Sequence, residues 1–322
     1  MGAGIVEPVG DWEGAKPSHR GLLDWLANEF MKSRYDSRRL VRTIVTSQAY
    51  GREALGSNRK SSATRRFFAA PDPRRLEAEQ IVDALAYCSG RSLDVEELTF
   101  DPDARRPASN RLTLGIPTRA WMFANLANER DRPSLNLPRA QLIGDLLLVF
   151  GWNGARQNPR TDRETQANAL QPGMMSNSLA TQHFIRAVGG GALSALAREA
   201  KTPEDLVRRI YQRYLSRMPS THELEFFSEV LSEGFEQRIL ASVSYDKPSV
   251  QESFAIPEST GSFPKVTWSN HLRPEANQIA MELERLARRG PAVDPWIEKQ
   301  WRERLEDVVW CMINTDEFIW LP

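Results

Sequence analysis

The sequence has little cysteine, no long hydrophobic run and no excess of charge of either sign. Its two cysteines cannot form a disulfide framework or a four-cysteine zinc site. The longest apolar run, Leu146 to Phe150, is far shorter than the ~20 residues that a membrane-spanning helix needs. The 42 basic residues balance the 42 acidic ones, whereas proteins that coat nucleic acid usually carry a basic excess. The sequence therefore predicts no membrane span and argues against nucleic acid as a partner.

Hydrophobic residues and arginine are abundant. Of the 322 residues, 41% are hydrophobic and 9% aromatic, which is enough to bury a sizeable core and too much for a disordered chain. The basic residues are 35 arginines and only 7 lysines. Arginine forks suit the recognition of phosphate or sulfate. Because these arginines are spread along the whole chain, we favour a general compositional bias.

Helix signals dominate the first half of the chain. Ser18 is suited to N-cap one helix and Asp36 a second, and apolar residues recur at helical spacing after each. A third helix is expected from Pro73, with Gly90 as its C-cap. Residues 91–137 are rich in proline, asparagine, arginine and aspartate and show no sustained period.

The second half predicts further helices, at about 138–150, 172–188, 273–289 and 295–318. Thr202, followed by proline and two acidic residues, starts another helix, and Ser220 with Glu223 forms the capping box of the next. Their short connection predicts an antiparallel helical hairpin. No β-hairpin pattern and no internal repeat is present. The predicted fold class is all-α, an irregular multi-helix domain with long polar loops.

The domain organisation follows from the same patterns. Residues 1–17 are expected to form an N-terminal junction segment, and residues 18–322 a single helical domain. A long irregular excursion is expected at 244–271.

Motifs that carry chemistry are missing. The glycine run at 189–191 lacks the lysine and hydroxyl residue of a phosphate loop, and no G-x-S-x-G elbow is present. No histidine is paired with another, or with a cysteine, at metal-ligand spacing. The sequence therefore predicts no metal site and no cofactor. We expect surface or helix-end roles for the four histidines, which are His19, His183, His222 and His271.

Two polar loops flank the helix expected at 138–150 and hold the candidate site. Glu129 and Asp131 are candidate paired carboxylates for acid–base chemistry. The candidate binding residues, which would hold an anionic substrate, are Arg130, Arg132, Asn136, Arg139, Arg156 and Arg163. The loops leave opposite ends of a helix ~18 Å long, so they meet only if one folds back along it. The other interpretation, which we favour, is a network of ion pairs and backbone hydrogen bonds that orders long loops.

Two other residue types give weaker indications. Tryptophans in or beside loops can stack on sugar rings, although they more often anchor a loop to the core. Those tryptophans are Trp12, Trp121, Trp152 and Trp268. Cys88 and Cys311 lie in apolar helical patterns, so we expect two buried thiols rather than a disulfide.

Four segments together resemble a known family. They are Ser18-His19-Arg20-Gly21-Leu22-Leu23-Asp24-Trp25-Leu26-Ala27, the helix Arg42-Thr43-Ile44-Val45-Thr46-Ser47-Gln48-Ala49-Tyr50, the stretch from Pro73 to Leu85, and the stretch from Leu305 to Phe318. Their sequences and order are similar to those of the planctomycete-type domain of unknown function fifteen-fifty-three. One departure is Arg20-Gly21, where relatives favour Pro-Glu.

The resemblance implies a context rather than a reaction, because the family has no established activity and no agreed catalytic residues. Its members usually form the C-terminal module of large exported proteins, after a partner domain of unknown function (fifteen-forty-nine). Some also carry a cytochrome-c-like domain. The resemblance thus implies a periplasmic or otherwise exported protein. The chain shows no signal peptide, so it would be cytoplasmic if this is the full product, and we expect Met1 to be an internal start within a longer protein.

Two hypotheses of function follow. The first is a non-catalytic helical interaction module of a larger exported protein, which predicts exposed apolar side chains near residues 1–30. The alternative is an enzyme or binding module that acts on an anionic glycan through the arginine, asparagine and carboxylate loops. That hypothesis predicts Glu129, Asp131, Arg132 and Arg156 around one cleft.

Overall fold

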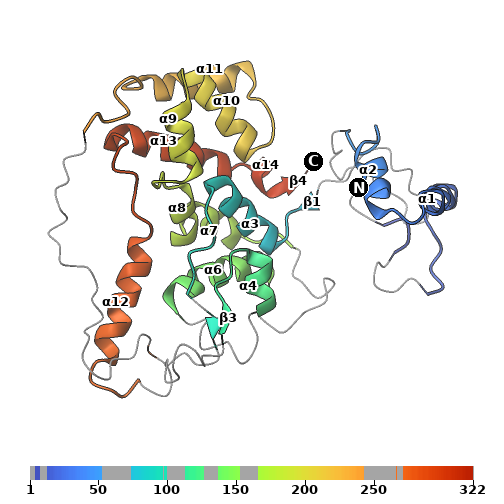
Figure 1. Cartoon of the computed structure of the whole chain (residues 1–322), viewed down its shortest axis with the longest axis horizontal. Helices are drawn as coiled ribbons and strands as arrows, with labels where there is room; N and C mark the ends of the chain where they lie inside the picture. Colours follow the sequence, from blue (N-terminus) through green and yellow to red (C-terminus); the bar gives the residue numbers. More distant parts are fainter. Residues whose placement is uncertain are drawn as a thin grey trace. The chain divides into compact units, whose positions relative to one another are not determined.

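The computed structural model describes residues 4–7, 13–52, 74–96, 98–99, 113–126, 137–152, 166–242, 266 and 271–321. The chain is all-α, as predicted, and its few strands are two or three residues long (Figure 1). Backbone contacts divide it into two compact units, one of Met1–Leu76 with Ile319–Pro322, and one of Glu77–Phe318. Of the excursion expected at 244–271, only Val266 and His271 are among the described residues.

The larger unit holds most of the helices. They are α3 (Ala78–Ser89), α4 (Ala120–Leu126), α6 (Pro138–Val149), α7 (Leu170–Asn177), α8 (Leu179–Ile185), α9 (Ala192–Glu199), α10 (Pro203–Tyr214), α11 (Thr221–Ser232), α12 (Ala276–Arg289), α13 (Lys299–Ile313) and α14 (Asp316–Ile319). Strands β2 (Leu98–Thr99) and β3 (Thr113–Gly115) pair antiparallel. None of the described helices is long and apolar enough to cross a membrane.

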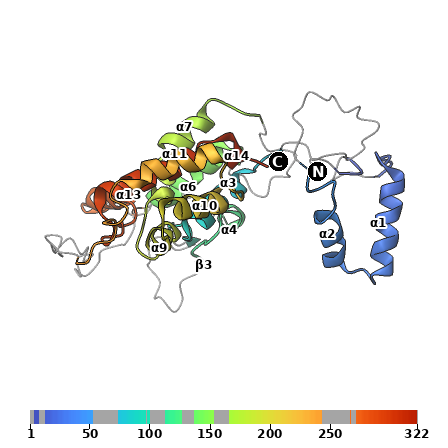
Figure 2. The ribbon, with the colours of Figure 1, turned by 90° about the horizontal axis from the view of Figure 1, so that it is seen from above.

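The hairpin of α10 and α11 forms as predicted, and the two helices lie side by side (Figures 1 and 2). The Thr202 hydroxyl accepts a hydrogen bond from the Asp205 amide at the start of α10. At the start of α11, Ser220 and Glu223 form the expected reciprocal capping box. Local capping rules were sufficient here because all the partners lie within one turn of the chain.

The core of the larger unit lies where α3, α6, α8, α10 and α13 meet. Helices α3 and α6 are buried along one side, which agrees with their periodic apolar residues. Gly90 ends α3 with a φ of 71°, the left-handed conformation expected of a glycine C-cap. The largest fully buried side chains are Trp301, Phe123, Ile81, Leu85, Leu146, Leu147, Met175, Leu193, Leu206, Ile210 and Leu231.

Three helix predictions are wrong in their extent. The helix expected at 295–318 begins at Lys299 and ends at Ile313, before the short helix α14. The other two have a common cause. The helix expected at 172–188 is two helices, because Ser178 takes an extended backbone (φ −69°, ψ 146°) and its hydroxyl caps α8 through the Thr181 amide. The helix expected from Pro73 begins later, since Glu77 and Gln80 form a capping box and residues 74–75 are in strand β1. In both cases a polar side chain that bonds the local backbone begins a helix inside an apolar pattern.

The smaller unit contains α1 (Arg20–Lys32) and α2 (Ser37–Val45), packed side by side (Figure 2). Asp36 caps α2, as predicted, by accepting from two amides. The cap of α1 is His19 rather than Ser18, because the Ser18 hydroxyl donates to the Ile5 carbonyl instead. Strand β1 (Arg74–Arg75) pairs antiparallel with β4 (Trp320–Leu321) in the same unit.

Candidate functional site

The polar loops predicted to carry a site fall largely outside the described residues. Seven of the eight candidates are there, namely Glu129, Arg130, Asp131, Arg132, Asn136, Arg156 and Arg163. Whether their side chains meet therefore stays a prediction. The structure describes Arg139, at the beginning of α6.

Arg139 lies in a network that fixes the start of α6. Its Nη1 donates to Asp94 at 2.6 Å, and its Nε lies 3.5 Å from the buried Glu96 carboxylate. The same carboxylate accepts hydrogen bonds from the backbone amides of Arg139, at 3.1 Å, and Ala140, at 2.8 Å. Glu96 thus caps the positive end of α6, although it lies more than forty residues away in sequence. This geometry supports the structural interpretation for Arg139.

Several other arginines close the C-terminal ends of helices. Arg238 is 7% exposed, and its guanidinium donates to the carbonyls of Ala197, Ala200 and Phe235 at 2.6–2.7 Å. Two of these carbonyls belong to the last turn of α9 and its C-cap, where the helix dipole is negative. Burial lowers the pKa of Arg238, and the charge of Glu236 offsets only part of this shift.

The same arrangement recurs at other helix ends. Arg213 donates to the carbonyls of Tyr87 and Cys88 at the end of α3, at 2.7 and 2.6 Å. Arg186 donates to the Arg289 carbonyl at the end of α12, and Arg304 to the Glu233 carbonyl after α11. Helix termini leave carbonyls without partners, and a fork of N–H donors satisfies two at once. Helix capping therefore explains part of the high arginine content, which the sequence analysis interpreted as a general compositional bias.

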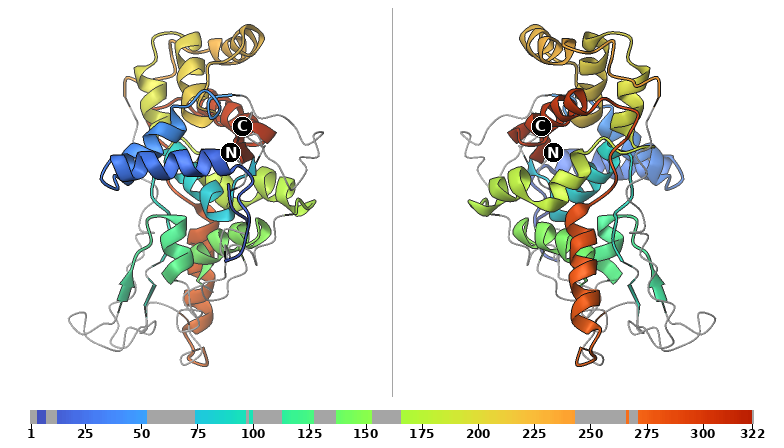
Figure 3. Two further views of the ribbon diagram at one scale, coloured as in Figure 1. Left: turned by 90° about the vertical axis from the view of Figure 1, so that its right-hand side faces the viewer. Right: turned by 90° about the vertical axis from the view of Figure 1, so that its left-hand side faces the viewer.

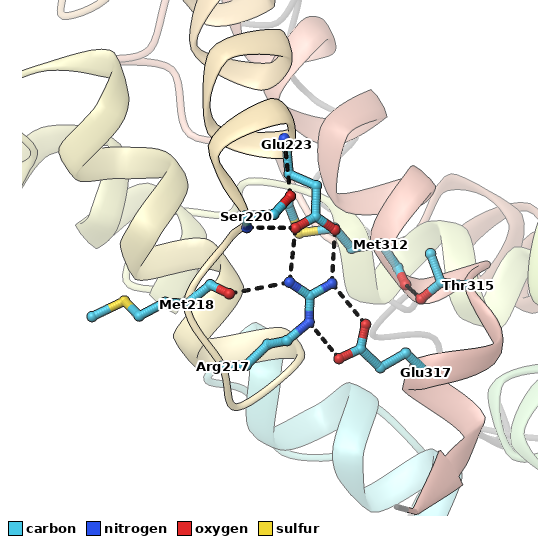
Figure 4. Close-up of polar contacts among 7 residues, drawn as sticks. All are labelled: Arg217, Met218, Ser220, Glu223, Met312, Thr315 and Glu317. Carbon is cyan, nitrogen blue, oxygen red and sulfur yellow. Dashed lines mark hydrogen bonds and ion pairs between the residues drawn. The ribbon is translucent and has the colours of Figure 1, made fainter. Parts of the chain in front are cut away.

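The densest charged cluster surrounds Arg217, between α10 and α11 (Figure 4). Arg217 bonds both carboxylate oxygens of Glu223, at 2.7 and 2.8 Å, and both of Glu317, at 2.5 and 2.8 Å. Its fifth N–H donates to the Met218 carbonyl at 3.1 Å. An arginine has five donors, so none is left for a ligand. The cluster holds α14 against the α10–α11 hairpin.

Charge pairing in this cluster shifts the pKa of its members. The hydrogen bonds from Arg217 lower the pKa of Glu223 to about 2, and the Ser220 cap adds to the shift. Hydrogen bonds from Arg217 to the carboxylates of Glu223 and Glu317 raise the pKa of Arg217 above its usual range. A carboxylate with so low a pKa cannot serve as a general base near neutral pH.

The histidines also have structural roles. The His19 Nδ1 accepts from the Leu22 amide and caps α1, and His222 is exposed in the first turn of α11. His183 lies against the end of α12, where a Cβ on Gly290 would come within 2.3 Å of its ring. Burial, and then the charge of Arg186, lower the pKa of His183. Among the described residues no group of three or more His, Cys, Asp and Glu side chains could hold a metal ion.

Of the two loop tryptophans that the structure describes, one is buried in the core and the other is exposed. Trp152 is buried beside Phe123, whereas Trp121 is 57% exposed at the start of α4. Trp12 and Trp268 lie outside the described residues.

Cys88 is a buried free thiol, as expected, but the expectation is wrong for Cys311, which is free and exposed. Helical periodicity placed Cys311 on the apolar side, yet α13 is covered only by the helices on its other faces.

The two helices of the smaller unit expose several large apolar side chains. No residue of α1 or α2 is buried. The exposed side chains, called here the hairpin face, are Trp25, Met31, Tyr35, Val41, Ile44, Val45 and Tyr50. Sequence periodicity identified most of them as the apolar sides of two helices. The pattern alone does not show whether such a side is buried or exposed.

The comparisons with known proteins give a family and no function. The profile of the family described as "PSD1: Protein of unknown function (DUF1553)" matches residues 1–231. The chain therefore belongs to this family, as its motifs predicted. The last resembling segment, at 305–318, lies beyond the matched residues. No curated protein matches the chain. No solved structure matches it either.

Proposed function

We propose that the chain is a helical interaction module that binds another polypeptide through the hairpin face. The observation that carries the proposal is the exposure of the apolar side chains of α1 and α2, with Val41 57% and Trp25 49% exposed. Contiguous exposed apolar surface on a protein commonly marks an interface. The charged residues described in the preceding subsection outside the hairpin are engaged in capping or ion pairs.

The stability of the hairpin supports the same proposal. Helices α1 and α2 have 13 and 9 residues. Isolated helices shorter than ~12–15 residues are marginal in water, and they depend on burial of an apolar face. The one ring contact of the hairpin is the edge-to-face pair Phe30–Tyr35, with centroids 5.4 Å apart. A second apolar surface over Val41, Ile44 and Val45 would supply the missing burial.

The charge expected of the partner follows from the arginines beside the hairpin face. Arg38 and Arg42 lie on α2 beside the exposed Val41 and Val45, and neither forms an ion pair with a described residue. A matching surface is apolar with an acidic rim. The family resemblance implies a partner domain fused upstream in a large exported protein. We take that domain as the partner and an exported assembly as the setting.

The test is a titration of the chain with that partner domain, produced as a separate polypeptide and followed by calorimetry. The double variant Val41→Asp, Ile44→Asp should weaken binding by at least a hundredfold, because two charges replace buried apolar groups at roughly 1.4 kcal/mol or more each. Met281→Asp, on the exposed side of α12, is the matched control and should bind like the parent chain.

Thermal unfolding of the variants without partner distinguishes an intermolecular face from an internal one. If the hairpin face binds a partner, the double variant and Met281→Asp should unfold at similar temperatures. A drop of many degrees in the double variant alone would mean that the chain covers this face itself, and the proposal would fail. Equal affinity of the double variant and the parent chain would also refute it.

An anionic glycan is the second candidate, and Trp121 is the observation that favours it. Trp121 is exposed in the first turn of α4, eight residues before Glu129 in the sequence, and an exposed tryptophan can stack on a sugar ring. Affinity electrophoresis in sulfated and uronic polysaccharides tests this function. Retardation that is lost in Trp121→Ala and reduced in Arg132→Gln would support it, and unchanged mobility in every polysaccharide would exclude it.

A further inference from the structure

A groove with a volume of about 430 Å³ runs between α6 and α12 in the larger unit, where α12 lies along the side of α6 (Figure 3). Its volume falls in the range of roughly 300–1,000 Å³ that is typical of small-molecule sites. The described residues of its apolar floor are Leu137, Leu142, Leu179, Ala280, Leu283 and Ala287. A surface of this kind favours an apolar ligand body.

The charged groups that line the groove differ in whether they have a partner. Glu284 and Arg288 are paired with each other along α12, with an Nη2–Oε1 distance of 2.7 Å. Asp145, on the α6 wall, forms no hydrogen bond or ion pair with any residue that the structure describes. Asp145 lines the groove and is exposed to solvent, and partial desolvation raises the pKa of its carboxyl group. Asp145 thus differs from Asp94, Glu96 and the other carboxylates above, which all have donors.

We propose that this groove binds a small organic cation, with its ammonium group beside the Asp145 carboxylate and its apolar body over Leu142, Leu283 and Ala287. An ammonium group would gain an ion pair with this carboxylate, whereas an anionic ligand would be repelled by it and a neutral one would gain no ion pair. A single carboxylate is too few ligands for a metal ion. The proposal is independent of the hairpin face, which belongs to the other unit.

The experiment is an NMR titration of the full chain with phenethylammonium, 2-phenylethanol and 3-phenylpropanoate, which share an aromatic body and differ in charge. Saturable shifts should occur at the amides of α6 and α12. The ammonium compound should bind more tightly than the alcohol, and the carboxylate should bind least. Asp145→Asn should weaken binding of the ammonium compound about fivefold, which is the effect expected from loss of an exposed ion pair. It should leave the affinity for the alcohol unchanged.

Two further variants fix the location. Ala280→Phe, at an exposed position of the α12 wall, fills the groove and should remove binding of all three compounds. Glu225→Gln removes an exposed carboxylate of α11 and should change nothing. Circular dichroism verifies that each variant is folded. No saturable shift, equal affinity for the ammonium compound and the alcohol, or full affinity in Asp145→Asn would each overturn the proposal.

Discussion

Replacement of Arg238 tests the claim that buried arginines stabilise this fold by closing helix ends. In Arg238→Met the side chain keeps a similar length and apolar stem but loses three hydrogen bonds to carbonyls. Hydrogen bonds from a charged donor contribute roughly 1.5–3 kcal/mol each. Release of the guanidinium from a buried position offsets part of this loss, because burial lowers its pKa and so opposes its charge.

The net effect expected for Arg238→Met is a loss of about 4 kcal/mol in the free energy of unfolding, close to that of other buried charges whose contacts are broken. For a unit of this size that corresponds to a fall in Tm of about 10 °C. Arg238→Lys keeps the charge but lacks the fork, so it should lose about half as much. Urea unfolding followed by circular dichroism measures both values.

The control is Arg288→Met, which removes an arginine that is paired with Glu284 on the surface of α12. An exposed ion pair of this kind contributes under about 1 kcal/mol. If Arg238→Met cost no more than Arg288→Met, the carbonyl contacts of Arg238 would be incidental. The explanation of the arginine content by helix capping would then be wrong.

Three other outcomes are expected. The low pKa of Glu223, about 2, means that its pairing stabilises the fold above the usual glutamate pKa and that this contribution is lost as pH falls towards 2. Stability curves should therefore depend less on pH between about 2 and 4.5 in Arg217→Met than in the parent chain. Gly144→Ala should raise the unfolding free energy by about 0.5–1 kcal/mol, since the added Cβ meets nothing within 4 Å and alanine favours helix; a lower urea midpoint would contradict this. A thiol reagent at pH 8 should modify Cys311 and spare Cys88, whose pKa burial raises to about 11, and mass spectrometry after digestion would reveal the opposite order.

Sequence patterns predicted those parts of the fold whose signals are local. The capping box of α11 and the glycine end of α3 each involve residues within one turn, so propensity and spacing were enough. The break at Ser178 was missed because an apolar pattern continues across it, and only the backbone shows that its hydroxyl begins a new helix. Boundaries of this kind depend on competition between local bonds.

The candidate site was harder to predict because its charged residues have partners far away in sequence. Arg139 was identified as a possible anion ligand from its loop, but its partners Asp94 and Glu96 come from another segment. The reverse holds for Asp145, which reads as an ordinary polar position of an amphipathic helix. Its lack of a partner emerges only when α12 is placed beside it. Spacing along the chain carries no information about such pairings.

The contact between Leu231 and Trp301 has a consequence for how this family is divided into domains. The family profile ends at residue 231, yet the Leu231 side chain is fully buried and its carbonyl accepts a hydrogen bond from the Trp301 indole at 3.1 Å. A fragment cut at that point would expose the surface on which α13 lies. Residue 231 is thus a limit of sequence similarity inside one compact unit, and expression fragments of relatives should extend through the counterpart of α14.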